Sequence, residues 1–266
     1  MDHQTDLEAA ASAVPPDLPG LPPAALVEIA GFALRRARAD GPVIRALNRV
    51  GGGIEARYAG LPPAARRALE QGLGEMLEQV YRGAAFAGRH PKMPETGNWA
   101  HGVAVAAGGA LGGVGGIGTA LVELPATVAL LFGAMQKIAG EYGFDPAADE
   151  VRLTCLDIFG SGGPGTADDG VNTAFLGARL TLNGSGVQAL VRQVAPAFAA
   201  VLGRKLAGQV VPVIGAAAGA GINLAYLSYY RDMAHIRFGL QRLALRHGIE
   251  PIRTQYEADV ARLIAR

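Results

Sequence analysis

Residues 108–125 are GGALGGVGGIGTALVELP, and the way this stretch folds decides the fold class of the chain. Its centre, 113–118, has the spacing GxGxxG, which in a dinucleotide-binding turn lets backbone amides reach a pyrophosphate. The segment also carries a small residue at every fourth position, which on a helix forms a smooth stripe where another backbone can approach. These small residues are Ala100, Ala104, Gly108, Gly112, Gly116 and Ala120. The first interpretation predicts an enzyme, and the second predicts a helical protein whose glycine-rich helices are packed in a core or associate with a membrane.

The dinucleotide interpretation lacks the elements that should surround it. A nucleotide site of this type needs a strand before the glycines, a helix after them, and an acid about twenty residues on at the end of a second strand. The segment GVAVA at 102–106 could form the strand, but the acids that follow are Glu123, inside the expected helix, and Glu141, at a helix end. We therefore favour the helix and expect no nucleotide or other cofactor.

A second segment repeats the stripe of small residues. In VVPVIGAAAGAGINLAYLSYY, residues 210–230, Gly215, Gly219 and Asn223 follow one another at intervals of four. Two such helices are expected to pack against each other or a common neighbour, through Gly108, Gly112, Gly116, Gly215 and Gly219. Each interior glycine costs about 0.8 to 1 kcal/mol of helix propensity relative to alanine. These helices should therefore be stable only when they are packed or in lipid.

The uncharged run 102–122 is formally long enough to span a bilayer. Glycine and alanine contribute little to membrane insertion, and the carboxylate of Glu123 would be costly in hydrocarbon. We therefore expect a buried hairpin rather than a transmembrane pair, and reversible membrane association stays open.

Most other segments show apolar residues at helical spacing, and no run alternates convincingly between apolar and polar residues. Helices are expected after Pro22 and Pro23, after Pro62 and Pro63, and from Asp145 as an N-cap, and the tail should form two amphipathic helices broken at Gly248 and Pro251. The sequence predicts an all-α multi-helix bundle around the two glycine- and alanine-rich helices. Residues 1–22 are expected to be a flexible, proline-rich lead, and residues 23–266 a single domain.

Composition narrows the function classes. Half of the residues are hydrophobic and only 18% are charged, which indicates deep burial or contact with lipid. The 24 basic residues nearly balance the 23 acidic ones, so we expect no nucleic-acid partner. The single cysteine, Cys155, lies in the apolar segment VRLTCLDIF and is predicted to be a core thiol. The acidic, proline-rich start has no signal-peptide pattern, which favours a cytoplasmic location unless an internal segment inserts.

Four segments together resemble the EcsC family, a group of bacterial proteins named for the third member of an operon that encodes an ABC transporter. They are ALVELPATVALLFGAMQKIAGEYGFD, RLTCLDIF, GRKLAGQVVPVIGAAAGAGIN and RDMAHIRFGLQRLALRHGIEPIRTQYE. The resemblance covers roughly residues 100–257. It implies an association with transporter-linked secretion, and members sometimes carry a peptidase label. The positions that match the family pattern are Glu123, Pro125, Arg179, Lys205, Pro212, Gly215, Asn223 and Arg242.

Four polar residues, Glu123, Arg179, Lys205 and Asn223, lie in or beside apolar helices, where they must find partners. One interpretation is an internal network of ion pairs and hydrogen bonds that fixes the helix register. The other is a small polar pocket between the two glycine-rich helices, which holds a lipid headgroup or another anionic ligand against Lys205.

Catalytic motifs are missing from the sequence. There is no HExxH zinc motif, and the serines in FGSGG (159–163) and NGSGV (183–187) both miss the GxSxG pattern. We assign no catalytic residue and no metal ligand, and we lean against an enzyme. The expected function is that of a non-enzymatic EcsC-type protein, peripheral at the inner face of the membrane, that binds lipid or a membrane transporter and assists transport or secretion. The alternative is a peptidase-like hydrolase of unknown substrate.

Overall fold

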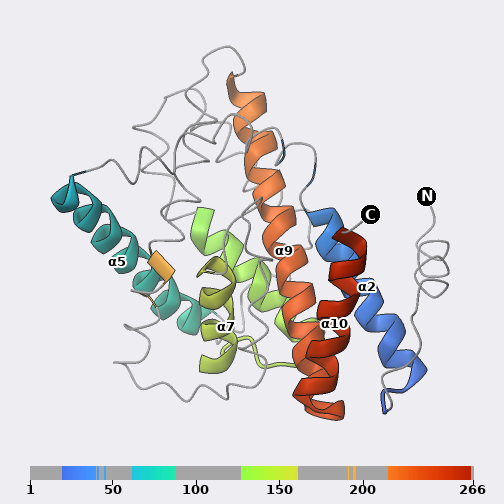
Figure 1. Ribbon diagram of the computed structural model, residues 1–266. Coiled ribbons are helices and arrows are strands. Elements are labelled where there is room, and N and C mark those ends of the chain that lie inside the picture. Colours follow the sequence, from blue (N-terminus) through green and yellow to red (C-terminus); the bar gives the residue numbers. More distant parts are fainter. Residues whose placement is uncertain are drawn as a thin grey trace.

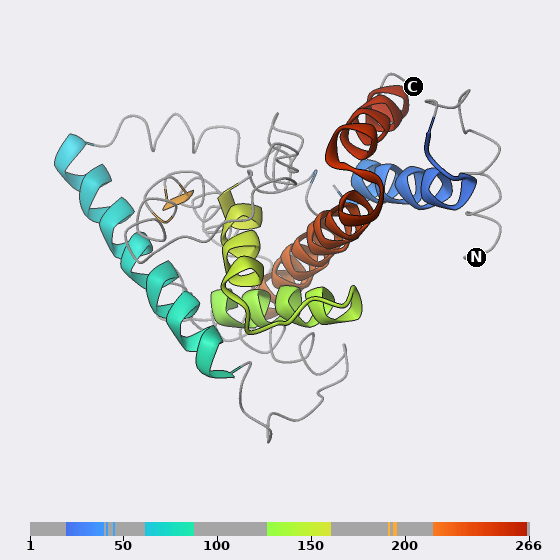
Figure 2. The ribbon, with the colours of Figure 1, turned by 90° about the horizontal axis from the view of Figure 1, so that it is seen from below.

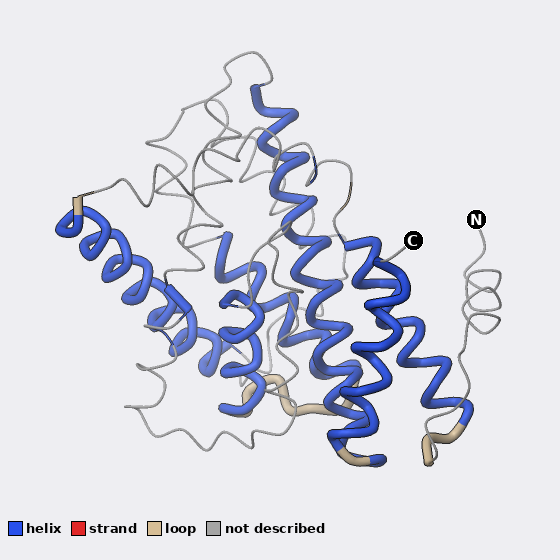
Figure 3. Tube along the Cα trace, viewed as in Figure 1, coloured by secondary structure: helices blue, strands red, loops and turns tan. Residues whose placement is uncertain are grey.

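The computed structural model describes residues 20–39, 41, 45, 62–87, 127–160, 191, 194–195 and 215–264. The secondary structure of these ranges is helical and contains no strand (Figure 3), which confirms the predicted all-α class. The chain is also helical from 127 to 141. The labelled helices are α2 (Pro23–Ala39), α5 (Pro63–Ala87), α7 (Asp149–Gly160), α9 (Gly215–His247) and α10 (Ile249–Ile264).

Helix α9 is the central element of the described structure. Helices α2 and α10 pack against α9 and against each other, and α7 contacts α9 on another side (Figures 1 and 2). Helix α5 packs against α7 and lies farther from α9 (Figure 2). Helix α9 therefore joins the pair α2 and α10 to the pair α5 and α7. Residues on different faces of this one helix contact distant parts of the chain.

Helix α9 is longer than the sequence analysis predicted. It continues for 33 residues from the glycine-rich segment through the charged tail, which the sequence suggested were separate helices. It ends at Gly248, whose φ of 90° is the left-handed conformation that glycine adopts most easily, and whose N–H donates to the carbonyl of Ala244 at 2.9 Å. Pro251 lies in the first turn of α10, where its missing N–H costs nothing. The tail is therefore broken at one residue, and not at Pro251.

Helix α7 is buried on all sides, from Val151 to Phe159. Its buried charges consequently need partners within the protein. Arg237 of α9 donates to the Asp157 carboxylate at 2.9 Å, and their side chains are only 3% and 9% exposed. The helix starts at Asp149 and not at Asp145 as predicted, because the Asp145 carboxylate accepts the N–H of Ala147 at 2.9 Å and caps a separate turn.

Cys155 is fully buried in α7, which confirms that it is a core thiol. Burial raises the pKa of the thiol far above its ordinary value, so that the group stays protonated and unreactive at neutral pH.

Three contacts show the register of α2 along α9. Arg242 donates to the carboxylate of Glu28, and Arg35 donates to that of Asp232 at 2.6 Å. Between these ion pairs, Phe32 faces Gly239 so closely that a Cβ on Gly239 would lie 2.1 Å from the end of the phenyl ring. The residue numbers fall on α9 as they rise on α2, so the two helices run in opposite directions in a single register.

Several sequence predictions lie outside the described residues. They include the stripe glycines Gly108, Gly112 and Gly116, and the division of the chain at residue 22 stays a prediction. Gly215 and Gly219 form the first turns of α9, where the helix itself is described but not its side-chain contacts. Within the described ranges, every helix is too short or too polar to cross a bilayer, and the uncharged run 102–122 falls outside them.

The contact at Gly239 predicts opposite effects for two glycines of the same helix. Gly239→Ala should destabilise the protein by about 1 to 2 kcal/mol, because the cost of overpacking against Phe32 exceeds the gain in helix propensity. Gly221→Ala is the matched control, since nothing lies within 4 Å of its added Cβ, and it should be neutral or stabilising. Urea unfolding of both variants measures the difference. A Gly239→Ala protein as stable as Gly221→Ala would refute the close approach.

Candidate functional site

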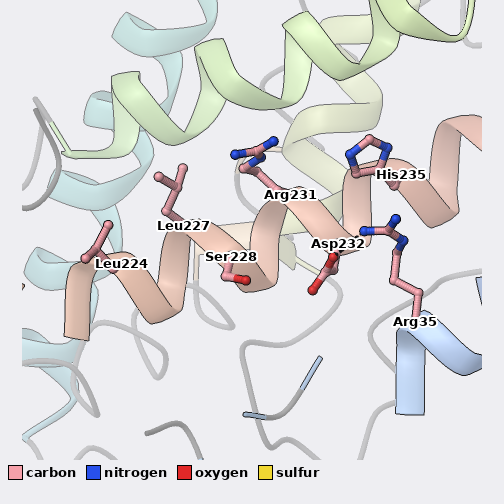
Figure 4. Close-up of a pocket in the computed structure, with 7 residues that line it drawn as sticks. All are labelled: Arg35, Leu224, Leu227, Ser228, Arg231, Asp232 and His235. Carbon is pink, nitrogen blue, oxygen red and sulfur yellow. Dashed lines mark hydrogen bonds and ion pairs between the residues drawn. The ribbon is translucent and has the colours of Figure 1, made fainter. Parts of the chain in front are cut away.

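A pocket of about 340 Å³ lies between α2 and the part of α9 that runs from Leu224 to His235. Figure 4 shows its lining, which comes from α9 apart from one arginine of α2. The residues on α9 follow the spacing of one helix face. The lining residues are Arg35, Leu224, Leu227, Ser228, Arg231, Asp232 and His235. Pockets for small ligands measure roughly 300 to 1,000 Å³, so this one suits a small ligand or the headgroup of a larger one.

The charges in the pocket do not balance. Arg35 pairs with Asp232, and Arg231 forms no ion pair with any residue in the described part of the chain. Among the described lining residues, two guanidinium groups therefore face one carboxylate, which leaves a net positive charge. Burial raises the pKa of Asp232, and the hydrogen bond from Arg35 opposes this effect.

His235 is neutral at physiological pH. Burial, followed by the positive charges of Arg35 and Arg231, lowers its pKa from 6.5 to about 4. Its Nδ1 lies 3.3 Å from the hydroxyl of Tyr142, and the two rings meet edge to face with their centroids 5.8 Å apart. Burial also raises the pKa of Tyr142, which keeps its hydroxyl protonated. Tyr142 lies in the turn after the helical segment 127–141, so this contact joins that segment to the pocket.

One end of the pocket is apolar. Leu227 is buried, whereas Leu224 is 43% exposed and lies at the rim. Leu224 precedes Arg231 by seven residues, so their Cα atoms lie roughly 10 Å apart along the helix axis. The pocket therefore combines a cationic end with an apolar end, a pattern that suits an amphiphile with an anionic group.

The pocket also contains a serine, a histidine and an aspartate, but they do not form a catalytic triad. Ser228 and His235 are seven residues apart on one helix, which places them roughly 10 Å apart along its axis and beyond hydrogen-bond reach. The Nδ1 atom of His235 lies against Tyr142, and Asp232 pairs with Arg35. A serine activated by this histidine is therefore not supported. Nowhere among the described residues do three His, Cys, Asp or Glu side chains gather as a metal site.

The residues singled out by the sequence are only partly described. Asn223 is buried in α9, with 1% of its surface exposed, directly before Leu224 of the pocket. Arg242 pairs with Glu28, and its guanidinium lies 5.1 Å from the centroid of the Tyr142 ring. Glu123, Arg179 and Lys205 lie outside the described residues, so the predicted pocket between the glycine-rich helices stays a prediction.

Sequence reasoning missed the pocket that the structure describes. The polar residues Ser228, Arg231, Asp232 and His235 interrupt an apolar helix at intervals of three and four, a periodic pattern that could have been found. Arg35 could not, because it precedes Asp232 by 197 residues and meets it only through the packing of α2 on α9.

Comparison with known proteins gives one family. The model of the EcsC protein family matches residues 89–243, which include most of α9 and all of its pocket residues. No curated protein and no solved structure matches the chain.

The depressed pKa of His235 predicts a stability effect between about pH 6.5 and pH 4. In this window the unfolded chain binds a proton on this histidine and the folded chain does not, so the contribution of His235 to stability falls as the pH falls. The free energy of unfolding of the wild type relative to His235→Gln should therefore decrease as the pH is lowered from 7 to 4. Urea unfolding across this range measures it, and a difference independent of pH would contradict the half-buried, neutral histidine.

Proposed function

The chain belongs to the EcsC protein family, and on this premise we propose that it is a non-enzymatic accessory protein that binds anionic lipid at the inner surface of a membrane. Its role would be to assist transport or secretion by an ABC transporter, the association that the family's name carries. The observation that supports lipid binding most directly is the α9 pocket, in which Arg231, with no ion pair among the described residues, lies about two helical turns from exposed Leu224.

The size of the pocket favours binding of a headgroup over carriage of a whole lipid. A volume of about 340 Å³ accommodates a phosphate with its glycerol, but it is far smaller than a phospholipid with two acyl chains. The chains of a bound lipid would therefore stay in the bilayer, next to the leucine at the pocket rim. This geometry supports attachment to a membrane surface rather than transfer of lipid through solution.

The electrostatic part of this attachment should be modest and sensitive to salt. A single uncompensated arginine near an anionic surface contributes on the order of 1 kcal/mol, and added salt screens it. Salt does not screen the apolar contribution of Leu224 at the rim. We therefore expect weak, reversible binding.

Vesicle sedimentation tests the proposal with a matched pair of charge reversals. Arg231→Glu removes the uncompensated cation of the pocket, whereas Arg246→Glu makes the same change at an exposed site in the last turn of α9. The wild type should sediment with phosphatidylcholine vesicles that contain phosphatidylglycerol and not with vesicles of phosphatidylcholine alone. Arg231→Glu should lose most of this binding, and Arg246→Glu should keep it.

Two results would count against the proposal. Equal binding of the wild type to neutral and anionic vesicles would exclude recognition of the anionic headgroup. Equal loss in both variants would indicate attraction by general surface charge and not by the pocket. Circular dichroism of each variant confirms that the helices are intact.

A further inference from the structure

We propose that the α9 pocket binds an oxyanion, the phosphate or carboxylate of its ligand, through Arg231 and the Nε2–H of His235, and that Asp232 is an internal counter-ion which the ligand displaces from Arg35. This inference rests on the proposed function for the lipid that would carry the group. It gives separate roles to Arg231, His235 and the pair of Arg35 and Asp232, and it predicts one substitution that strengthens binding.

Arg231 and His235 form one side of the site. They are four residues apart on α9 and project to the same side of the helix in Figure 4, so their N–H groups can reach one ligand. A guanidinium presents paired donors that match the oxygens of a phosphate or carboxylate. Arg231 is available for this role because it has no ion pair within the described ranges.

His235 contributes a neutral donor. The hydroxyl of Tyr142 stays protonated and can donate to Nδ1, which leaves the imidazole proton on Nε2. The groups that face this histidine are Arg231 and Asp232 on α9, Arg35 on α2 and Tyr142 from the turn after the segment 127–141. Burial, followed by the charges of the two arginines, holds the pKa of His235 low, and a bound anion would oppose the arginines and raise the pKa.

Asp232 competes with the ligand for Arg35. In Figure 4 the guanidinium of Arg35 lies between Asp232 and His235, where it could turn from the carboxylate to a bound anion. The side chains of this ion pair are 39% and 23% exposed, unlike the buried pair of Arg237 and Asp157, so its loss should disturb the fold little. The two roles of Asp232 therefore predict different results for Asp232→Asn. If Asp232 is an internal counter-ion, this variant binds an anion more tightly, whereas if the ion pair is only structural, anion binding is unchanged or weaker.

The test is a titration with sulfate, followed through the imidazole signals of His235 by nuclear magnetic resonance. Sulfate is an oxyanion that does not titrate between pH 4 and 8, so any proton uptake belongs to the protein. Sulfate should raise the pKa of His235, and Arg231→Gln should weaken sulfate binding roughly tenfold, the usual scale of one charge-assisted contact. His235→Gln identifies the signal, and Arg246→Gln is the matched control that should leave binding unchanged.

Asp232→Asn is the decisive variant. It removes the competing negative charge and frees Arg35, so sulfate should bind several-fold more tightly than to the wild type. Unchanged or weaker binding by this variant would overturn the counter-ion role, and full binding by Arg231→Gln would overturn the oxyanion site. Urea unfolding of both variants shows that the comparison is made between folded proteins.

Competition measurements with glycerol phosphate and with vesicles distinguish the source of the anion. They also separate failure of the oxyanion site from failure of the proposed function. One outcome is that both glycerol phosphate and phosphatidylglycerol vesicles compete with sulfate, and that both lose this competition when Arg231 is replaced. This outcome would identify the ligand as a lipid headgroup. Binding of sulfate and glycerol phosphate without vesicle binding would support the oxyanion site, identify a soluble phosphate as its ligand and contradict the proposed function. Vesicle binding without any effect of sulfate or glycerol phosphate on His235 would overturn the oxyanion site and leave the proposed function standing.

Discussion

Helix α2 lies against α9 in one register because Gly239 has no side chain where the ring of Phe32 packs. The two ion pairs on either side of this contact, Glu28 with Arg242 and Arg35 with Asp232, follow from the same register. A shift of one helical turn would separate both pairs and would remove Arg35 from the pocket. The pocket thus depends on the missing side chain of Gly239, about one helical turn from the nearest lining residue, His235. The charged residues only complete a geometry that packing imposes.

The interhelical ion pairs of α9 differ in burial, and the difference separates structure from function. The pair of Arg237 and Asp157 is closed to solvent and joins α9 to α7, where loss of one partner would leave a buried charge uncompensated. The pair of Arg35 and Asp232 is partly exposed to solvent and lies in a pocket, with a third charged residue, Arg231, beside it. The first pair can only hold the helices together, whereas the second can exchange a partner without unfolding the protein.

Much of the fold could be predicted from the sequence, because helical periodicity and proline positions are local properties. The starts of α2 and α5 at Pro23 and Pro63, the buried Cys155 and the all-α class all follow from such local patterns. The length of α9 was not predicted, since a change from glycine-rich to charged composition resembles a boundary even where the backbone continues. The α9 part of the pocket was visible as a polar stripe at 228–235, but Arg35 joins it only through tertiary packing.

The register of α2 on α9 builds the pocket, and nuclear Overhauser effects between Phe32 and Gly239 test this register most directly. In a protein labelled selectively at glycine and phenylalanine, the Hα protons of Gly239 should show strong effects to the ring protons of Phe32, together with an upfield ring-current shift. Gly221 should show neither. A Gly239 signal at an ordinary shift, with no effects to Phe32, would contradict the register and the pocket that rests on it.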